Sequence, residues 1–204
     1  MDFLRPNSLS ALRALARSVV RWMLLAAMIS SACTAPARPL AAQTEGPTEY
    51  QVKAAFLFNF AKFVEWPDAV LAGARTPIVL GILGEDPFGN DLSLIVTGQS
   101  VRGRTVSIRK YRFGDDLRDC HILFVSASER MHMAQILASL QGASVLTVSD
   151  MPGFAGGGGV VQFYMEEVRV RFVVNVDGAA RANLRVSAKL LAVAHVMNDV
   201  LGVR

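Results

Sequence analysis

Three runs of apolar residues constrain most strongly what this 204-residue chain can fold into. They are Ile78–Leu83, His121–Val125 and Val145–Val148, and helix-length segments lie among them. Runs without polar alternation are typical of strands that are buried on both faces, as in a parallel sheet covered by helices. We therefore expect an α/β fold in a single domain, with a mixed, mostly parallel sheet and helices on both faces.

Capping signals predict the helices that connect these strands. Asp86 before Pro87 is typical of an N-cap with proline at the first helical position, and predicts a short helix to about Val96. Ser128 is placed to cap a helix over 129–140. This alternation of strands and helices favours a parallel layer.

The remaining strands are predicted from shorter patterns. Thr105–Tyr111 alternates as a strand does, and Val160–Met165 and Val168–Val176 are expected to form a C-terminal antiparallel hairpin. Residues 150–159, which end in four glycines, are expected to form a mobile loop. A final helical region is expected over 177–197.

A helix rich in phenylalanine precedes the sheet. Thr48 is placed to cap it, and Pro67 is expected to end it at about residue 65. On a helical wheel its apolar residues fill about half the circumference, with Lys53 inside the apolar arc, where its long stem would snorkel. Phe58 falls on the polar side together with Lys62.

Phe58 and Trp66 each have two open interpretations. Phe58 lies either under a covering segment of the chain or on a protein–protein surface, such as a homodimer contact, with Lys62 beside it. Trp66 either anchors the helix end against the sheet or enters a partner's pocket. On the predicted hairpin, Arg169 and Arg171 are same-face neighbours, which form a solvated strand face or bind an acidic patch on a partner.

The N-terminus has the order of a secretory signal peptide. A positive region from Arg5 to Arg21 precedes the apolar run Trp22–Ile29, and small residues follow it. We expect a signal peptide and leader over residues 1–42 and an exported, periplasmic domain over 43–204. The alternative is an N-terminal membrane anchor, for which the apolar run is short.

Lipidation at Cys33 is not expected, because Ser30-Ser31-Ala32 lacks the large aliphatic residue of a bacterial lipobox. If Cys33 leaves with the signal, Cys120 is the only thiol and no intramolecular disulfide is possible. Cys120 is expected to be a buried small hydrophobe, with an intermolecular bridge as the alternative.

Charge argues against a nucleic-acid partner. The formal net charge is +4, but from Gln43 onward 16 Lys and Arg residues balance 16 Asp and Glu residues. Such a neutral body lacks the basic face that nucleic-acid binding needs.

No catalytic motif is present, so we expect no enzyme activity, no cofactor and no metal ion. The three histidines are scattered, and the glycine run 156–159 is not followed by the Lys-Ser or Lys-Thr of a phosphate loop. The expected strand ends carry Asp86, Ser126, Ser128 and Ser149, which either line a small-molecule crevice or cap helices.

Several blocks of this sequence together resemble the YfiR-like family of bacterial periplasmic proteins. The most specific are the helix block Tyr50–Pro67 and the block Val170–Asp177, which contains Arg-Phe-Val-Val-Asn. Pro77–Gly84, Cys120–Val125 and Leu184–Leu191 follow the family's order, so the resemblance covers about residues 49–200.

This resemblance implies a mixed α/β fold, residence in the periplasm and a regulatory role without catalytic residues. The best-understood member binds the periplasmic sensor domain of an inner-membrane diguanylate cyclase and represses it. An outer-membrane lipoprotein sequesters that repressor, so that cyclic di-GMP rises and biofilm matrix is made. That member has structural disulfides, whereas the mature part of this chain retains only Cys120.

Overall fold

The structure, a computed structural model, describes residues 46–71, 73 and 76–198. The signal peptide and leader predicted for residues 1–42, together with Cys33, lie outside the described residues.

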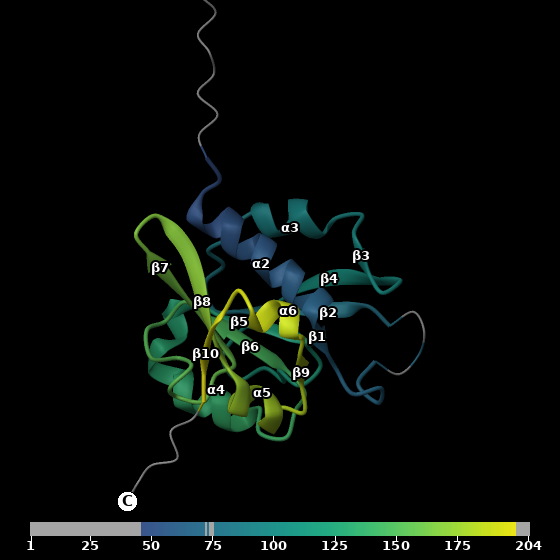
Figure 1. The fold of residues 1–204 in the computed structure, drawn as a ribbon. Coiled ribbons are helices and arrows are strands. Elements are labelled where there is room, and N and C mark those ends of the chain that lie inside the picture. The colour runs from purple at the N-terminus through teal and green to yellow at the C-terminus, as the bar shows by residue number, and fades with distance from the viewer. Residues whose placement is uncertain (1–45, 72, 74–75, 199–204) are drawn as a thin grey trace, which may run out of the picture. The chain divides into compact units, whose positions relative to one another are not determined.

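The apolar runs of the sequence lie side by side at the centre of a mixed sheet (Figure 1). Among the described residues, the sheet has the strand order β10 (His195–Met197), β8 (Arg169–Asn175), β7 (Val161–Glu166), β6 (Leu146–Ser149), β5 (Ile122–Val125), β2 (Ile78–Leu83), β4 (Arg104–Tyr111) and β3 (Ser100–Val101). The strands from β7 to β4 are parallel to their neighbours, as is β10 to β8. The β7–β8 hairpin and the short β3 are antiparallel. The predicted mostly parallel sheet with a C-terminal hairpin is confirmed.

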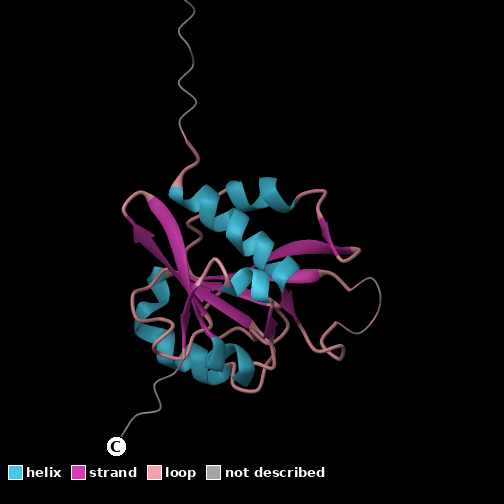
Figure 2. Ribbon diagram, in the orientation of Figure 1, coloured by secondary structure: helices cyan, strands magenta, loops and turns pink. Residues whose placement is uncertain are grey.

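The central strands bury both faces, as their composition predicts. In β2, Leu80 and Ile82 belong to one apolar cluster, while Val79 and Leu83 belong to a second cluster across the sheet. Helices α2 (Glu49–Phe63) and α3 (Asp91–Val96) cover the first face, and α4 (Met133–Ser139) covers the other (Figure 2). The continuous apolar runs therefore follow from two helical layers around one sheet.

Helix α2 begins where the sequence indicates and ends slightly early. The Thr48 hydroxyl accepts from the Gln51 backbone, and the Gln51 side chain accepts from the Thr48 N–H, which completes a capping box. The chain leaves the helix after Phe63 because β1 (Val64–Glu65) pairs with β9 (Arg185–Val186). The aromatic side of α2 packs on the sheet, with Phe60 stacked on Phe163 at 5.8 Å between ring centroids.

Two predicted helix caps are wrong. The helix after Asp86 begins at Asp91 instead, because the Asp86 carboxylate accepts from the Phe88 N–H and holds a turn there. The cap after β5 is Ser126, which accepts from the Ser128 N–H at the start of η1 (Ala127–His132), a 3₁₀ helix before α4.

The region predicted as helical at 177–197 contains several short elements. It holds α5 (Val176–Arg181), β9, α6 (Ala188–Leu191) and β10. Asn183 at φ 55° interrupts the helix, and the Ser187 side chain caps the next one. Pairing of β9 with β1 and of β10 with β8 then outweighs the local helical preference.

The glycine-rich segment 150–159 is packed against the sheet, and the expectation of a mobile loop is wrong. Phe154 is fully buried, and its backbone N–H donates to the Met151 carbonyl. The Gly159 N–H donates to the Phe154 carbonyl at 3.0 Å, and a Cβ at Gly159 would overlap the Phe154 ring. Glycine is therefore needed here for the close approach of an aromatic ring.

Gly159→Ala is expected to lower the free energy of unfolding by about 2 kcal/mol, because the added methyl group displaces the Phe154 ring from its pocket. Gly156→Ala in the same glycine run is the control, since its Cβ would lie 3.6 Å from the Gly153 carbonyl oxygen, an ordinary contact. Chemical denaturation of both variants makes the comparison. Equal stabilities would contradict the packed arrangement.

Candidate functional site

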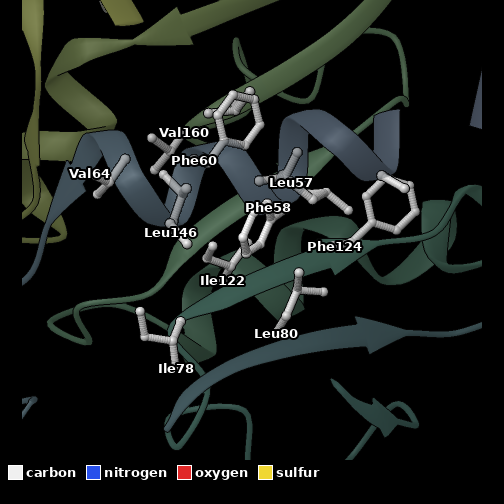
Figure 3. Packing of buried hydrophobic residues seen from close by; sticks show 14 of the residues in the cluster. Leu57, Phe58, Phe60, Val64, Ile78, Leu80, Ile122, Phe124, Leu146 and Val160 are labelled. Atoms are coloured by element: carbon white, nitrogen blue, oxygen red, sulfur yellow. The ribbon is translucent and has the colours of Figure 1, made fainter. Parts of the chain in front are cut away.

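The two aromatic residues proposed for a partner surface are buried. Phe58 is 6% exposed and points from α2 toward the strands, in the direction of Ile122 (Figure 3). Of the two interpretations of Phe58, the one that places it on an exposed surface is therefore wrong, because its side chain fills the core between helix and sheet. Trp66 is also buried, and its Nε1 donates to the His121 carbonyl at 3.3 Å. Trp66 thus anchors the helix end, as one of its two interpretations holds.

The three cations of the predicted partner surface do not form one patch. Lys62 is exposed, and its ammonium lies 4.3 Å from the centroid of the Phe58 ring, which it covers. Arg169 and Arg171 lie on β8 on the face opposite to Phe172, which packs against α2. Arg171 Nε donates to Glu166 Oε2 at 2.9 Å. The cations therefore flank different faces of the sheet.

The side chains of the predicted crevice are engaged in local structure. Ser128 accepts from the Glu85 N–H, and Ser126 caps η1. Fully buried Ser149 donates to the Val125 carbonyl and accepts from a backbone N–H. Asp86 pairs with Lys110 at 2.9 Å as well as holding its turn. A hollow of about 560 Å³ beside α4 and α5 is lined by none of the four predicted crevice residues.

A buried network that the sequence analysis did not single out lies beside the end of β6. Lys53 on α2 has a side chain that is 3% exposed, and its ammonium lies 2.7 Å from Asp150 Oδ2 and 2.5 Å from Glu49 Oε1. The Tyr50 hydroxyl donates to the same Asp150 oxygen at 3.0 Å. The Tyr50 ring packs edge-on against Phe88 at 5.6 Å. One carboxylate therefore joins the first turns of α2 to the carboxyl edge of the sheet.

The network keeps both of its proton donors protonated. Burial alone would lower the pKa of Lys53, but hydrogen bonds from its ammonium to Asp150 and Glu49 outweigh this and raise the pKa above its ordinary value. Burial raises the pKa of Tyr50, and the Asp150 carboxylate acts in the same direction. At neutral pH a charged ammonium and a neutral phenol are poor bases and nucleophiles, and the contacts of both with Asp150 hold α2 against the end of β6 as a structural clamp.

The signal for this clamp was present in the sequence. Lys53 falls inside the apolar arc of its helix, and a buried ammonium needs a carboxylate partner. The sequence could not name that partner, because Asp150 follows α2 by 97 residues and only the fold brings them together.

Two further titratable groups lie in the core. Burial raises the pKa of the Cys120 thiol to about 12, and its Sγ donates to the Leu117 carbonyl, so the thiol is unreactive. His121 is buried with its ring edge-on to Trp66, and its Nδ1 accepts from the Val79 N–H at 3.1 Å. Its Nε2 has no hydrogen-bond partner within the described residues. Burial lowers the pKa of His121, which is held neutral.

Metal and membrane sites were also sought in the described part of the chain. Among residues 46–71, 73 and 76–198, no three histidine, cysteine, aspartate or glutamate side chains gather closely enough to hold a metal ion. No helix within those ranges is both long enough and apolar enough to cross a bilayer.

The fold and the clamp define a mixed α/β protein whose buried ionisable groups serve structure. The sequence matches the model of the YfiR/HmsC-like family over residues 50–195, and the chain belongs to this family. Its members are periplasmic and regulatory. No curated protein matches the sequence.

A solved structure has a similar fold. It is the crystal structure of a conserved domain protein from Vibrio cholerae O1 biovar El Tor, with a TM-score of 0.51 and 8% sequence identity. The match covers 74% of this chain and 60% of that one, so this chain spans less than two thirds of that protein's length. At this identity the likeness concerns the fold alone.

Lys53→Met is expected to lower the free energy of unfolding by about 2–4 kcal/mol, because it leaves the Asp150 carboxylate without its cation in a largely buried place. Lys62→Met on the same helix is the matched control, since Lys62 is exposed and a change well below 1 kcal/mol is expected there. Urea denaturation measures both. A similar, small loss for the two variants would contradict the clamp.

Stability is expected to fall with acid through His121. The unfolded chain binds a proton at this histidine near its ordinary pKa of about 6.5, whereas the folded protein does so only at lower pH. The free energy of unfolding therefore decreases below that pH, and His121→Asn, which keeps an acceptor for the Val79 N–H, should show a shallower decrease between about pH 7 and 5. Exposed His195→Asn is the control. Parallel pH profiles for all three proteins would disprove this role.

Proposed function

We propose that this protein is a non-enzymatic periplasmic regulator that represses an inner-membrane diguanylate cyclase by binding the cyclase's periplasmic sensor domain. An outer-membrane lipoprotein that competes for the repressor would release the cyclase. Cyclic di-GMP level and biofilm formation would then depend on the share of repressor that is bound to the cyclase.

The observation that carries this proposal is the family match over residues 50–195, which spans nearly all of the described residues. The residues that match the family form the elements from α2 to the start of β10. A regulator of this kind needs a stable body with specific surfaces and has no need of a reactive group.

The chemistry of the buried groups agrees with a binding role. Lys53 and Tyr50 stay protonated in the clamp, and the Cys120 thiol is unreactive. The polar side chains at the strand ends serve as caps and turn holders. For this reason we do not propose the small-molecule crevice as a second function.

Repression requires only a difference in affinity between two states of the partner. The protein must bind the inactive conformation of the sensor domain more tightly than the active one. A coupling free energy of about 1–3 kcal/mol is typical of such regulation. Lys62 and Arg169 are exposed, and Arg171 is half-buried and paired with Glu166. These cations lie outside the core, so contacts of this size with a partner would not disturb core packing.

Deletion of the gene is expected to raise cellular cyclic di-GMP and biofilm mass, because the cyclase loses its repressor. Mass spectrometry of nucleotide extracts and a biofilm stain measure the two effects. Restoring the full chain should reverse both, whereas a form without residues 1–42 should not, since it would remain in the cytoplasm.

Unchanged cyclic di-GMP after deletion would overturn the proposal. Full reversal by the form without residues 1–42 would overturn its periplasmic part. Direct binding of the purified domain to the cyclase's periplasmic domain, measured by calorimetry, would separate repression by contact from an indirect effect.

A further inference from the structure

We propose that the outer edge of β4 is a docking site for an extended acidic segment of a protein partner, which adds to the sheet as a further strand. The inference rests on the proposed function, because it names the chemistry of the contact that a regulator of this kind would make. It concerns a surface other than the predicted cations on α2 and β8.

Among the described residues, the outer edge of β4 is unpaired along most of its length. On one side β4 pairs with β2 from Val106 to Tyr111. On the other side β3 pairs only with Arg104 and Thr105. Beyond Thr105, no strand of the described residues pairs with this side. Unpaired strand edges of this kind bind extended peptides through main-chain hydrogen bonds.

The backbone groups that face outward can be assigned from the register. Arg102 at φ 52° and Gly103 at φ 77° form a two-residue hairpin turn, so Val101 and Arg104 exchange hydrogen bonds and Arg104 faces β3. Alternation then directs the N–H and carbonyl groups of residues 106, 108 and 110 outward. The inward orientation of Tyr111, whose carbonyl accepts from the Gly84 N–H beyond β2, agrees with this assignment.

A groove lies along this edge of β4, beside the segment that connects α3 to β3. Its volume is about 440 Å³, and Val96, Val106 and Ile108 contribute its apolar lining. Gly98 and Gln99, in the segment that connects α3 to β3, form its border. They stand where a longer β3 would begin. An added strand would therefore place aliphatic side chains in the groove while its backbone pairs with β4.

Charge identifies the kind of strand that fits. Residues 100–114 contain five cations and no acidic residue: Arg102, Arg104, Arg109, Lys110 and Arg112. Three of these cations pair with Glu65, Asp119 and Asp86, and their own side chains are 51–69% exposed. The pairs with Glu65 and Asp119 are exposed on both sides and contribute little free energy, so an acidic strand can replace those two carboxylates at small cost. Asp86 is largely buried, but the Lys110 side chain that it pairs with is 69% exposed and accessible to an acidic strand.

A second copy of the chain is a poorer occupant of this edge. Two β4 strands paired antiparallel about a two-fold axis would bring together two edges that each carry these five cations and no acidic residue over 100–114. Like charges opposite each other destabilise a strand pair. An acidic segment gives the opposite sign and stabilises the pair.

The first test uses a labelled peptide of alternating glutamate and valine, with alternating lysine and valine as the matched control. Fluorescence anisotropy with the intact exported protein should show the acidic peptide binding at least about tenfold more tightly, and added salt should weaken it. Hydrogen exchange should show protection of residues 106–110. Equal affinity of the two peptides would overturn the proposal.

N-methylation of the acidic peptide tests the strand pairing without altering the protein. Alternate amides of an added strand face β4, so methylating one alternate set should abolish binding, whereas methylating the other set should leave it nearly unchanged. Equal effects of the two sets would show that the peptide is held by charge alone, and would overturn docking as a strand.

Lys110→Pro and Lys110→Ala form a matched pair on the protein side. Both remove the ammonium and its contact with Asp86, but only proline removes the outward N–H. The proline variant should bind the acidic peptide about tenfold more weakly than the alanine variant, with both variants folded by circular dichroism. Equal binding by the two folded variants would overturn the proposal, as would sedimentation showing a dimer that these substitutions break.

The peptide tests are independent of the cellular test. If deletion raises cyclic di-GMP but no strand docks on β4, the regulatory function stands and this surface is rejected. If the strand docks but deletion changes nothing, the surface stands and the proposed cyclase partner is rejected.

Discussion

The ion pair between Lys53 and Asp150 joins the first turns of helix α2 to the carboxyl edge of the sheet. Lys53 is in the apolar arc of an aromatic helix, so packing that arc also buries an ammonium. A buried ammonium avoids the cost of desolvating an unpaired charge only when carboxylates accompany it. Glu49 on the same helix supplies one carboxylate, and the less exposed Asp150, directly after β6, supplies a second from the sheet, while the phenylalanines of α2 pack among the strand side chains.

The other ionisable groups of the core also have hydrogen-bond partners. Tyr50 shares the Asp150 carboxylate, His121 supports the Val79 backbone, and Cys120 donates to a carbonyl. Burial shifts the pKa of each in the direction that keeps it uncharged. Such a core provides rigidity and little reactivity. Its interactions with other molecules must then occur at exposed edges and surfaces. Among the described residues, no strand pairs with the outer side of β4 beyond Thr105, and this edge is basic.

The agreement between sequence and structure depends on how local each signal is. The strand Ile78–Leu83 and the capping box at Thr48 were predictable, because apolar runs and caps act over a few residues. The burial of Phe58 was not, since its position on the wheel is polar and only neighbouring elements cover it. Sequence also placed the helix cap at Ser128 rather than Ser126, because two serines within one turn satisfy the same local rule.

The amino-acid sequence alone determined the α/β class, the parallel centre of the sheet and the family, because these follow from periodicity and from residues close together in the chain. Tertiary structure alone decided that Asp150 meets Lys53, that residues 150–159 pack closely, and that most of one side of β4 is unpaired within the described part of the chain. These features join residues far apart in sequence. Their free energy comes from burial and strand pairing that local preferences do not encode.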